Sequence, residues 1–417
     1  MDTKEKVKEL LRSGAKLPPK VIERTIKRTV LPWLEREEII VITGARQAGK
    51  SVFLYQLIYD YILKKSNNVY YFNLDIKNSI KFFEKPDNII NLVNKTKRKT
   101  YIIIDEVQRL KEPGLFLKGI YDLHLPVKII VSGSSSLELK SKIHEPLTGR
   151  KILFHLNPFN LEEISRALYP HNDIKDVVEH YVVYGGYPAI VLAKKRHIKL
   201  RLLKELFESY LDKDVKSYLH VENETAFSNL IKILASQAGN LINKDELSQT
   251  LGIHKNTLDN YLYYLEETFI LDLVKPFYKN PRKELLKNPK VYFQDLGLRN
   301  YAIGSFNPIE YRPDKGSIFE NMVYLCLREK DGNPQPVNYW RTKTGAEVDF
   351  IIMDGLNPIP YEAKASELTG YKITKSLRSF IDSYKPKNAY CINMSFNGTY
   401  KIDKTIITFI TPAEFVK

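Results

Sequence analysis

A short segment with a glycine at each end, residues 44–51, limits the possible folds of this chain more than any other stretch. It consists of Gly44, Ala45, Arg46, Gln47, Ala48, Gly49, Lys50 and Ser51, and it fits the pattern G-x-x-x-x-G-K-[ST] at every fixed position. A β-branched run at residues 38–43 suits a buried parallel strand, and residues 52–58 have the apolar spacing of a helix. The order of strand, glycine loop and helix indicates a loop that cradles phosphate groups.

The residues of this loop have distinct expected roles. The glycines let the backbone turn its N–H groups toward phosphate oxygens, and the loop delivers those oxygens to the positive end of the following helix. Lys50 would add a mobile positive charge, and Ser51 would offer a hydroxyl to Mg²⁺. Together with Val52 at the start of the helix, residues 44–51 form the expected nucleotide-binding set. The alternative is a glycine turn that binds nothing, and the flanking pattern disfavours it.

A second apolar run, residues 99–104, ends in the two carboxylates Asp105 and Glu106. This pattern is typical of a Walker B strand, because ligands bind at the carboxyl ends of parallel strands. Asp105 would hold Mg²⁺, and Glu106 would orient and polarise the attacking water. The sequence therefore predicts nucleotide hydrolysis and not binding alone.

Polar residues follow a third apolar run, residues 127–131. Ser132 or Ser134 could contact the γ-phosphate, although a serine-rich loop that caps the next helix is a nearly equal alternative. Arg150 could stabilise the charge of a nucleotide, its own or that of a neighbouring subunit, or it could be an ordinary surface arginine. The sequence leaves these alternatives open.

Short motifs form an ordered set along the chain, at residues 44–51, 104–108, 132–134, 147–150, 184–188, 317–321 and 345–350. This set resembles the AAA-type ATPases common in archaea and bacteria, which carry a C-terminal domain of unknown function with a restriction-endonuclease-like core. The similarity extends from about Arg36 onward. It implies an α/β protein in which a P-loop parallel-sheet ATPase domain precedes a helical connector, a winged helix and a restriction-endonuclease-like domain. An ATPase of this kind, using ATP and Mg²⁺, is expected to be a homo-oligomer.

The length of 417 residues is too great for one ordinary core, so we expect two to four domains. The patterns suggest an N-terminal helical segment at 1–35, the ATPase domain at 36–165, a helical connector or lid at 166–235, a winged helix at 236–300 and the restriction-endonuclease-like domain at 301–417.

The formal net charge of +15 favours a polyanionic partner. Excess positive charge attracts any anionic surface, so a nucleic acid, an acidic protein and a membrane surface all remain possible partners. Two isolated cysteines, Cys326 and Cys391, form no motif and suit a reducing cytoplasm. Because no apolar run approaches about 18 residues, we expect a cytoplasmic protein without a membrane partner.

A helix, a glycine turn and a second helix are expected at residues 244–262. Gly252 permits the turn, and the exposed Lys255, Asn256 and Asn260 of the second helix could contact phosphates or base edges of DNA. A following strand, residues 269–274, and a basic loop give a winged-helix shape. The alternative is a winged helix used for protein docking.

The expected wing is strongly basic. It holds six basic residues against the single acid Glu284, namely Lys275, Lys279, Arg282, Lys283, Lys287 and Lys290. Of these we expect Lys279, Arg282 and Lys283 to contact DNA phosphates, because a cationic wing attracts the backbone.

The C-terminal part contains an acid followed by a Glu-x-Lys group. Asp349 lies on one strand, and Glu362 and Lys364 share a face of the next. This order fits the metal-nuclease arrangement of the restriction-endonuclease-like fold. Asp349 and Glu362 would hold Mg²⁺ or Mn²⁺, and Lys364 would orient or deprotonate the attacking water. Glu320 fits the extra acid of many such nucleases, while the alternative is a retained fold without the chemistry.

Three classes of function follow from these patterns. The first is an ATP-coupled, metal-dependent nuclease. The second is a DNA-binding ATPase switch whose nuclease fold is inactive. The third is an ATPase that handles proteins or signals, which would show neither DNA stimulation nor steep salt dependence.

Overall fold

The computed structural model describes residues 21–94, 99–133, 146–168, 173–210, 223–277, 288–330 and 332–416. The chain forms two compact units: residues 1–158 with 331–333, and residues 159–330 with 334–417. The short strands β8 (Glu329–Lys330) and β9 (Asn333–Pro334) flank the point where the chain returns to the first unit. Each unit has its own cores and is described by itself.

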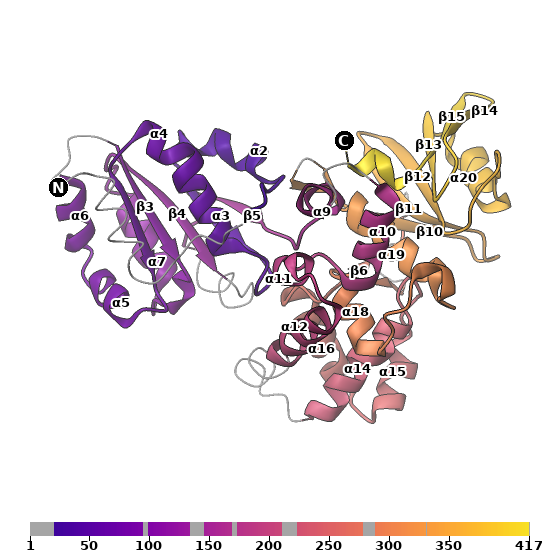
Figure 1. The fold of residues 1–417 in the computed structure, drawn as a ribbon, viewed down its shortest axis with the longest axis horizontal. Helices are drawn as coiled ribbons and strands as arrows, with labels where there is room; N and C mark the ends of the chain where they lie inside the picture. The colour runs from indigo at the N-terminus through magenta and orange to yellow at the C-terminus, as the bar shows by residue number, and fades with distance from the viewer. Residues whose placement is uncertain are drawn as a thin grey trace. The chain divides into compact units, whose positions relative to one another are not determined.

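The first unit is built on a five-stranded parallel sheet (Figure 1). The strands are β1 (Ile39–Thr43), β2 (Val69–Asn73), β3 (Thr100–Asp105), β4 (Val127–Gly133) and β5 (Lys151–His155). Their order across the sheet is β2-β3-β4-β1-β5. Every residue of β1 and β3 is buried, which explains why both strands have uninterrupted apolar sequences.

Helices cover both faces of this sheet (Figure 1). They are α2 (Lys27–Val30), η1 (Leu31–Leu34), α3 (Lys50–Leu57), the π-helix η2 (Ile58–Ile62), α4 (Leu63–Lys65), α5 (Lys77–Phe83), α6 (Asp87–Asn94), η3 (Val107–Arg109) and α7 (Pro113–Tyr121). One core packs α2, α3 and η2 against the sheet, and a second core packs α5, α6 and α7 against the other face. Successive residues of a strand pack into different cores, since their side chains point to opposite faces of the sheet.

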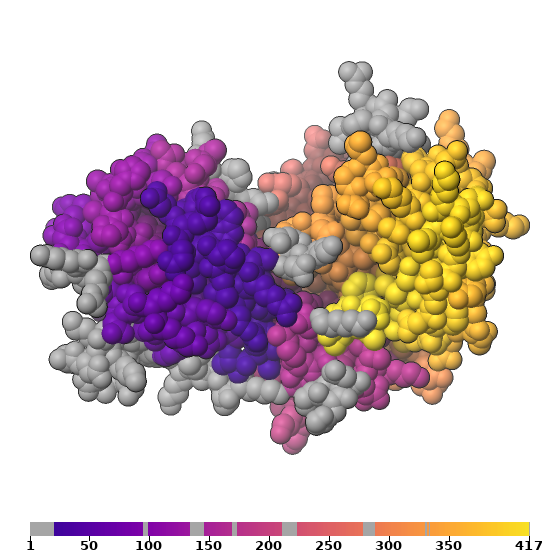
Figure 2. Space-filling model, turned by 90° about the horizontal axis from the view of Figure 1, so that it is seen from above, coloured from indigo at the N-terminus to yellow at the C-terminus, as the bar shows by residue number. Residues whose placement is uncertain are grey.

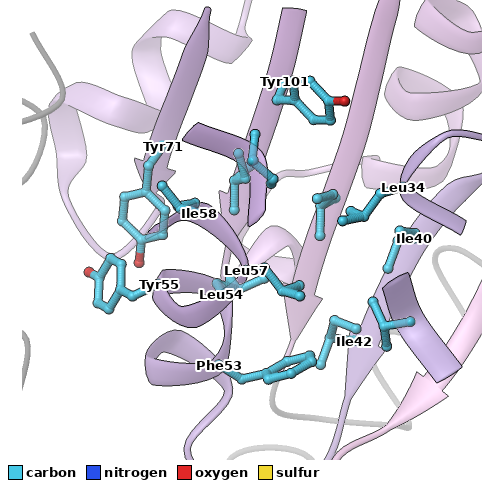
Figure 3. Close-up of a cluster of buried hydrophobic side chains, with 14 of the residues drawn as sticks. Leu34, Ile40, Ile42, Phe53, Leu54, Tyr55, Leu57, Ile58, Tyr71 and Tyr101 are labelled. Atoms are coloured by element: carbon cyan, nitrogen blue, oxygen red, sulfur yellow. The ribbon is translucent and has the colours of Figure 1, made fainter. Parts of the chain in front are cut away.

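Figure 3 shows the first of these cores. Ile40 and Ile42 of β1 pack with Phe53 of α3 in a buried cluster. Tyr55 and Tyr71 lie side by side at one end of it, with ring centroids 5.0 Å apart. This end of the core brings the hydroxyl of Tyr71 to the carboxyl end of the sheet, because that hydroxyl donates to Asp105 at the end of β3.

The second unit begins with helices and a small antiparallel strand pair. Its elements up to residue 327 are α9 (Leu161–Leu168), α10 (Ile174–Tyr184), α11 (Pro188–Leu192), α12 (Arg196–Ser209), α14 (Glu224–Ser236), α15 (Lys244–Leu251), α16 (Lys255–Glu267), β6 (Leu271–Val274), β7 (Lys290–Phe293), α18 (Leu296–Ile303), η5 (Ile309–Tyr311) and α19 (Lys315–Leu327). Helices α15 and α16 form where the helix-turn-helix pattern predicts them, and Gly252 ends α15 with φ of +63°.

A six-stranded mixed sheet completes this unit. Its order is β10-β11-β12-β13-β15-β14. The remaining elements are β10 (Asn338–Arg341), β11 (Glu347–Asp354), β12 (Asn357–Lys364), α20 (Lys375–Tyr384), β13 (Asn388–Asn393), β14 (Gly398–Ile402), β15 (Thr405–Ile410) and η6 (Pro412–Phe415). Strands β12, β13 and β15 pair in parallel, while β10, β11 and β14 pair antiparallel with their neighbours. In the space-filling view, the orange and yellow residues of this unit form a continuous surface (Figure 2).

A close approach between backbones explains the motif at residues 184–188. A Cβ on Gly186 would lie 2.1 Å from the carbonyl oxygen of Phe159. The N–H of Gly186 donates to Asp295 at 2.7 Å, and Asp295 also accepts from the N–H of Leu298 at 2.9 Å at the start of α18. Burial raises the pKa of Asp295 to about 6. The motif is therefore a packing joint between α10, α11 and α18.

The finer division of the second unit into connector, winged helix and C-terminal domain stays a prediction. The expected helical segment at 1–35 is described only from residue 21, where α2 and η1 form. Residues 1–20 lie outside the described part of the chain.

Candidate functional site

The glycine loop connects β1 to α3 in the first unit, as the sequence predicts. Gly44 has φ of +150°, and a Cβ there would lie 2.2 Å from the carbonyl oxygen of Leu156. Gly49 has φ of +97° and immediately precedes the first residue of α3. A side chain at position 44 would clash with Leu156, and one at position 49 would be strained by the positive φ, so the geometry favours glycine at both positions.

Lys50 is the first residue of α3 and is only 5% exposed. Its Nζ donates to the carbonyl oxygens of Gly44 at 3.0 Å and Ala45 at 2.9 Å. The ammonium group is thus folded back over its own loop. Ser51 and Val52 follow in the first turn of α3, and both are partly exposed.

Arg24, which belongs to no sequence motif, contacts the backbone of the glycine loop. Arg24 is buried, and its guanidinium donates to the carbonyl oxygen of Ala48 at 2.8 Å. It also donates to the carbonyl of Asn157. No local pattern could have found this contact, because Arg24 lies 24 residues before Ala48 in the sequence.

The carboxylate of Asp105 lies at the end of β3 and is held by two hydroxyl groups. Tyr71 donates to Asp105 Oδ2 at 2.7 Å, and Ser132 donates to Oδ1. Tyr71 comes from β2 and Ser132 from β4, the two neighbours of β3 in the sheet. Burial, together with the nearby charge of Asp105, raises the pKa of Tyr71 above its usual value. Asp105 is therefore fixed in orientation from both sides.

Glu106 follows Asp105 with a left-handed backbone, at φ of +59°. Its N–H donates to Ser132 Oγ at 3.4 Å, and its carboxylate accepts from the side-chain amide of Gln108. A non-glycine residue in this conformation is uncommon and often found at functional sites. Tyr71 and Gln108 are two further residues that the sequence did not single out. Tyr71 reaches Asp105 only through the fold, whereas Gln108 lies two residues from Glu106.

The glycine loop and these carboxylates lie at the same edge of the sheet. Thr43 at the end of β1 is in register with Gly133 of β4, and Ile104 of β3 is in register with Val131 of β4. Because neighbouring strands lie about 4.8 Å apart, β1 and β3 are separated by about 10 Å, with β4 between them. This spacing suits a phosphate chain and its metal ion between Ser51 and Asp105.

Of the residues expected to contact a nucleotide, Ser132 lies at the edge of the sheet that holds the glycine loop, whereas Arg150 does not. Ser132 lies at this edge, fully buried, with its hydroxyl bound to Asp105, and Ser134 lies outside the described residues. Arg150 precedes β5 and lies at the opposite edge, where its carbonyl accepts from Ile39 N–H at 2.9 Å and its side chain pairs with Asp122 at 2.7 Å. Thr43 is four residues further along the strand, or about 13 Å away. Arg150 therefore does not reach the nucleotide site of its own chain, and the alternatives of a neighbouring subunit's site and of an ordinary surface arginine remain.

The expected DNA-contacting helix of the second unit carries charges that are already paired. Lys255 Nζ lies 2.5 Å from Asp245, and Lys244 Nζ lies 2.5 Å from Asp259. Asn256 and Asn260 are exposed on the same helix. The wing residues Lys279, Arg282 and Lys283 lie outside the described residues. Strands β6 and β7, which flank them, pair antiparallel as a wing requires.

A buried lysine lies among the C-terminal acids. Lys290, the first residue of β7, is 2% exposed, and its Nζ lies 2.5 Å from Glu347 and 3.1 Å from Glu320. The hydroxyl of Tyr292 donates to the same Glu320 oxygen at 2.6 Å. The sequence grouped Lys290 with the basic wing, but the structure buries it against carboxylates.

Asp349, Glu362 and Lys364 come together across β11 and β12. Asp349 accepts from the N–H of Ala363 at 2.8 Å, and Lys364 Nζ lies 3.6 Å from Glu362 Oε2. The hydroxyl of Thr374 donates to Glu362 Oε1. Glu362 Oε2 is buried and has no hydrogen-bond partner among the described residues. The expected trio is thus assembled, with Glu362 at its centre.

The acids of this cluster titrate above their usual ranges. Burial raises the pKa of Glu320 to about 7, and the charge of Asp349 adds to this effect. Burial likewise raises the pKa of Asp349 and of Glu362, and their neighbouring lysines oppose it. Burial alone would lower the pKa of Lys290, but Glu320, Asp349 and Glu347 together raise it above the usual lysine value.

The two expected metal sites differ in how well they fit an ion. At the glycine loop, Ser51 and the oriented carboxylate of Asp105 offer the oxygen atoms that Mg²⁺ prefers, beside a loop whose path requires glycine at position 44. In the second unit, Lys290 occupies the space between Glu320 and Glu347. Across the parts of the chain that the structure describes, no three His, Cys, Asp or Glu side chains converge to hold a metal ion. Glu320, Asp349 and Glu362 therefore do not form the expected three-carboxylate metal site.

Comparison with protein families divides the chain into three parts. A family model described as an AAA domain matches residues 36–165. Two models described only as domains of unknown function match residues 175–308 (DUF8612) and 315–414 (DUF4143). With its glycine loop and parallel sheet, the segment at 36–165 is an AAA-type P-loop ATPase domain. Such a domain binds a nucleotide, typically with Mg²⁺.

Relatives span most of the chain at low identity. An uncharacterized protein of Methanocaldococcus jannaschii is 25% identical over 349 residues, which cover 80% of this chain and 75% of the relative. An uncharacterized protein of Haemophilus influenzae is 26% identical over 378 residues, covering 85% of this chain and 90% of the relative. A third, from Mycobacterium tuberculosis, is 25% identical over 350 residues, with 83% and 74% covered.

Among solved structures, a Walker-type ATPase of Pyrococcus abyssi has a TM-score of 0.48 at 15% identity, covering 69% of this chain and 99% of its own. The ORC2 protein of Aeropyrum pernix in its ADP form has a TM-score of 0.38 at 14% identity, covering 70% and 96%. Likeness at this level does not establish a shared fold over the whole chain. Within the described ranges of this protein, no helix is long and apolar enough to cross a membrane.

Proposed function

We propose that this protein is a Mg²⁺-dependent ATPase whose nucleotide cycle controls a C-terminal unit that contacts DNA. The observation that carries the ATPase part is the alignment at one sheet edge of the glycine loop with the carboxylates Asp105 and Glu106. Those groups supply the phosphate cradle, the metal-orienting acid and the water-orienting acid that hydrolysis requires.

Lys50 has a defined part in nucleotide binding. Its ammonium donates to two carbonyls of its own loop, Gly44 and Ala45. Phosphate oxygens of a bound nucleotide would compete with these carbonyls for the ammonium, because hydrogen bonds between charged groups are stronger than those to neutral acceptors. Binding then moves the lysine from neutral acceptors to the charged β- and γ-phosphates, while residues 44–49 supply backbone N–H groups.

Ser51 and Asp105 would hold Mg²⁺, which neutralises phosphate charge. Tyr71 and Ser132 keep the Asp105 carboxylate oriented toward that position. Glu106 would accept a proton from the attacking water after its bond with Gln108 rearranges. In this proposal Glu106 is the general base, and its carboxylate is hydrogen-bonded to Gln108 before the nucleotide binds.

Arg150 supports an oligomeric form of the enzyme. It is partly exposed at the edge of the sheet opposite its own glycine loop and pairs with Asp122. We propose that this arginine completes the nucleotide site of a neighbouring subunit in a homo-oligomer. The Asp122 pair would hold the side chain in place until that subunit binds.

A winged helix in residues 236–300 would be the DNA-contacting part. Support comes from the α15–α16 pair, the antiparallel β6 and β7, and the exposed amides of Asn256 and Asn260. The net charge of +15 favours a polyanion. Lys255 would contact phosphate by exchanging Asp245 for it, and the basic wing at Lys279, Arg282 and Lys283 would add contacts.

The six-stranded sheet would be a restriction-endonuclease-like domain that does not cleave. Asp349, Glu362 and Lys364 support the fold assignment because they lie together on adjacent strands. The neighbouring Glu320 is bound by Lys290 and Tyr292, which argues against a metal-dependent nuclease. A cytoplasmic location is part of this proposal, since DNA is the partner.

ATP turnover with and without DNA tests the proposal. Phosphate release should be measured for wild type, Lys50→Ala and Asp349→Ala with single-stranded, duplex and branched DNA in Mg²⁺ and in Mn²⁺. The same samples should be run on a gel. We expect DNA-stimulated turnover in wild type and in Asp349→Ala, none in Lys50→Ala, and no cleavage.

Three other results would change the assignment. Cleavage by wild type that Asp349→Ala abolishes would establish a nuclease. Turnover that no DNA changes, without salt-dependent DNA binding, would favour a protein-handling ATPase. Normal turnover in Lys50→Ala would contradict the ATPase site itself.

A further inference from the structure

The carboxylates at the centre of the second unit already have a positive charge among them. Lys290 extends from β7, and its Nζ lies 2.5 Å from Glu347 Oε1 and 3.1 Å from Glu320 Oε1. Asp349 also attracts this ammonium electrostatically. One lysine therefore serves three acids that come from α19 and β11.

Lys290 is firmly held in this position. It is 2% exposed, and β7 pairs with β6 over its full length. The adjacent backbone is bound as well, since the N–H of Val291 donates to the carbonyl of Asn240 and the N–H of Phe293 donates to Asn321. Because its strand is paired and its side chain is buried, Lys290 cannot move away from the acids as an exposed lysine could.

Each of the four acids of this cluster already has at least one carboxylate oxygen engaged by a neighbouring donor. Glu320 Oε1 accepts from both Lys290 and Tyr292, and Glu347 Oε2 accepts from Arg341 at 3.0 Å. Asp349 Oδ2 accepts from a backbone N–H, and Glu362 Oε1 accepts from Thr374. Mg²⁺ requires about six oxygen ligands in near-octahedral geometry, and among the described residues these contacts leave few carboxylate oxygens open, of which Glu362 Oε2 is one.

Charge leads to the same conclusion. A divalent ion near Lys290 would be repelled by the ammonium, and the repulsion is strong where water is excluded. Lys364 and Arg341 bring further positive charge, at 3.6 Å from Glu362 and 3.0 Å from Glu347. The four acids Glu320, Glu347, Asp349 and Glu362 thus already face three basic side chains.

We propose that Lys290 is the resident cation of this carboxylate cluster, which therefore binds an internal ammonium group where the fold family would have a divalent metal ion. Lys290 links the strand pair β6–β7 to the six-stranded sheet through Glu347. The nuclease-like site is then an ionic joint between two parts of the second unit, and it stays independent of added metal.

Mn²⁺ binding tests this proposal on the full chain. The paramagnetic signal of free Mn²⁺ should be titrated, without nucleotide, against wild type, Asp349→Asn, Lys290→Met and the double variant Lys290→Met with Asp349→Asn. Methionine replaces the aliphatic part of the lysine side chain and removes its ammonium group. Omitting nucleotide separates this test from the ATPase proposal.

We expect wild type and Asp349→Asn to bind Mn²⁺ equally weakly, through surface acids only. Lys290→Met should gain a Mn²⁺ site that the double variant loses, because removing the ammonium frees carboxylate oxygens. Thermal unfolding adds a second measurement, since Mn²⁺ should raise the melting temperature of Lys290→Met and leave that of wild type unchanged.

Two results would overturn the proposal. One is a Mn²⁺ site in wild type that Asp349→Asn removes. The other is a folded Lys290→Met protein that gains no Mn²⁺ site. If Lys290→Met does not fold, the comparison of wild type with Asp349→Asn decides alone. ATP turnover by the first unit of each variant reports whether the chain is otherwise intact.

Discussion

Lys50 of the first unit and Lys290 of the second unit are both buried, but their ammonium groups contact different kinds of acceptor. Lys50 donates to uncharged carbonyls of its own loop at 2.9 and 3.0 Å, whereas Lys290 lies against carboxylates at 2.5 and 3.1 Å. A charge held by neutral acceptors is ready for a polyanion, while a charge held by acids is neutralised. The comparison indicates that the acceptors around a buried lysine decide whether phosphate oxygens can compete for it or whether it stabilises the core.

Removing the charge of Lys50 should have the largest effect. We expect Lys50→Ala to lower ATP turnover by about a thousandfold, because an interaction with the transferring phosphate is lost. Phosphate release measures this. Lys65→Ala is the matched control, since Lys65 is an exposed lysine of the same unit that pairs with Glu35. Equal turnover in both variants would show that Lys50 does not act on the phosphate of ATP.

Removing the charge of Lys290 should reduce stability and leave ATP turnover unchanged. We expect Lys290→Met to lose about 3 kcal/mol in the free energy of unfolding, because Glu320 and Glu347 lose the buried ammonium group that lies against both of them. Urea denaturation followed by the fluorescence of Trp340 measures this, in a Trp33→Phe background that leaves Trp340 as the only tryptophan.

Lys404→Met provides the control for this measurement, because Lys404 is exposed in the same unit. If Lys290→Met and Lys404→Met unfold at the same urea concentration, Lys290 does not hold the cluster together.

The water-orienting acid of the first unit should act on catalysis alone. We expect Glu106→Gln to retain ATP binding and to hydrolyse it about a hundredfold more slowly, since general-base catalysis is lost. Nucleotide affinity and single-turnover hydrolysis should be measured separately. Glu112→Gln, an exposed neighbour, is the control. A normal hydrolysis rate in Glu106→Gln would remove Glu106 from this role.

A smaller effect should follow from loosening Asp105. Tyr71→Phe removes one hydroxyl from Asp105 Oδ2. We expect the Mg²⁺ concentration for half-maximal turnover to rise about tenfold, because groups behind a metal ligand tune its affinity. Tyr70→Phe is the control, since Tyr70 is the preceding residue of β2 and points to the other face. An unchanged Mg²⁺ dependence would show that Ser132 alone orients Asp105.

The smallest effect concerns pH. The pKa of Glu320 is raised from 4.5 to about 7 in the folded protein, mainly by burial and next by Asp349. The stability that this group contributes is fully present below its unfolded pKa and is lost as the pH rises through about 7. The urea midpoint of wild type should therefore fall over this range relative to Glu320→Gln. Parallel pH profiles of the two proteins would contradict the shift.

Local patterns were sufficient for several elements. The glycine loop, the flanking β1 and α3, and the helix pair around Gly252 form as predicted, because each depends on a few consecutive residues. Asp105 lies at the end of its strand for the same reason. In these cases periodicity, turn chemistry and sterics act over short segments.

Other features depend on contacts between segments far apart in the sequence. Tyr71 and Ser132 reach Asp105 only because β2 and β4 flank β3, an order that the chain sequence does not reveal. Arg150 could be assigned to an edge of the sheet only after β5 was seen to pair with β1. Such contacts arise from strand order and register, which depend on the packing of the whole sheet.

The amino-acid sequence by itself determined the phosphate-binding loop, the acidic strand end and the helix-turn-helix pattern, since local geometry dictates these. Only the tertiary structure decided the role of Lys290. In the sequence it is one of several basic residues in a cationic segment. The fold buries it in contact with Glu347 and with Glu320, which lies 30 residues away in the sequence. Whether a charge attracts a ligand or stabilises a core depends on its burial and on the charges that the fold brings near it.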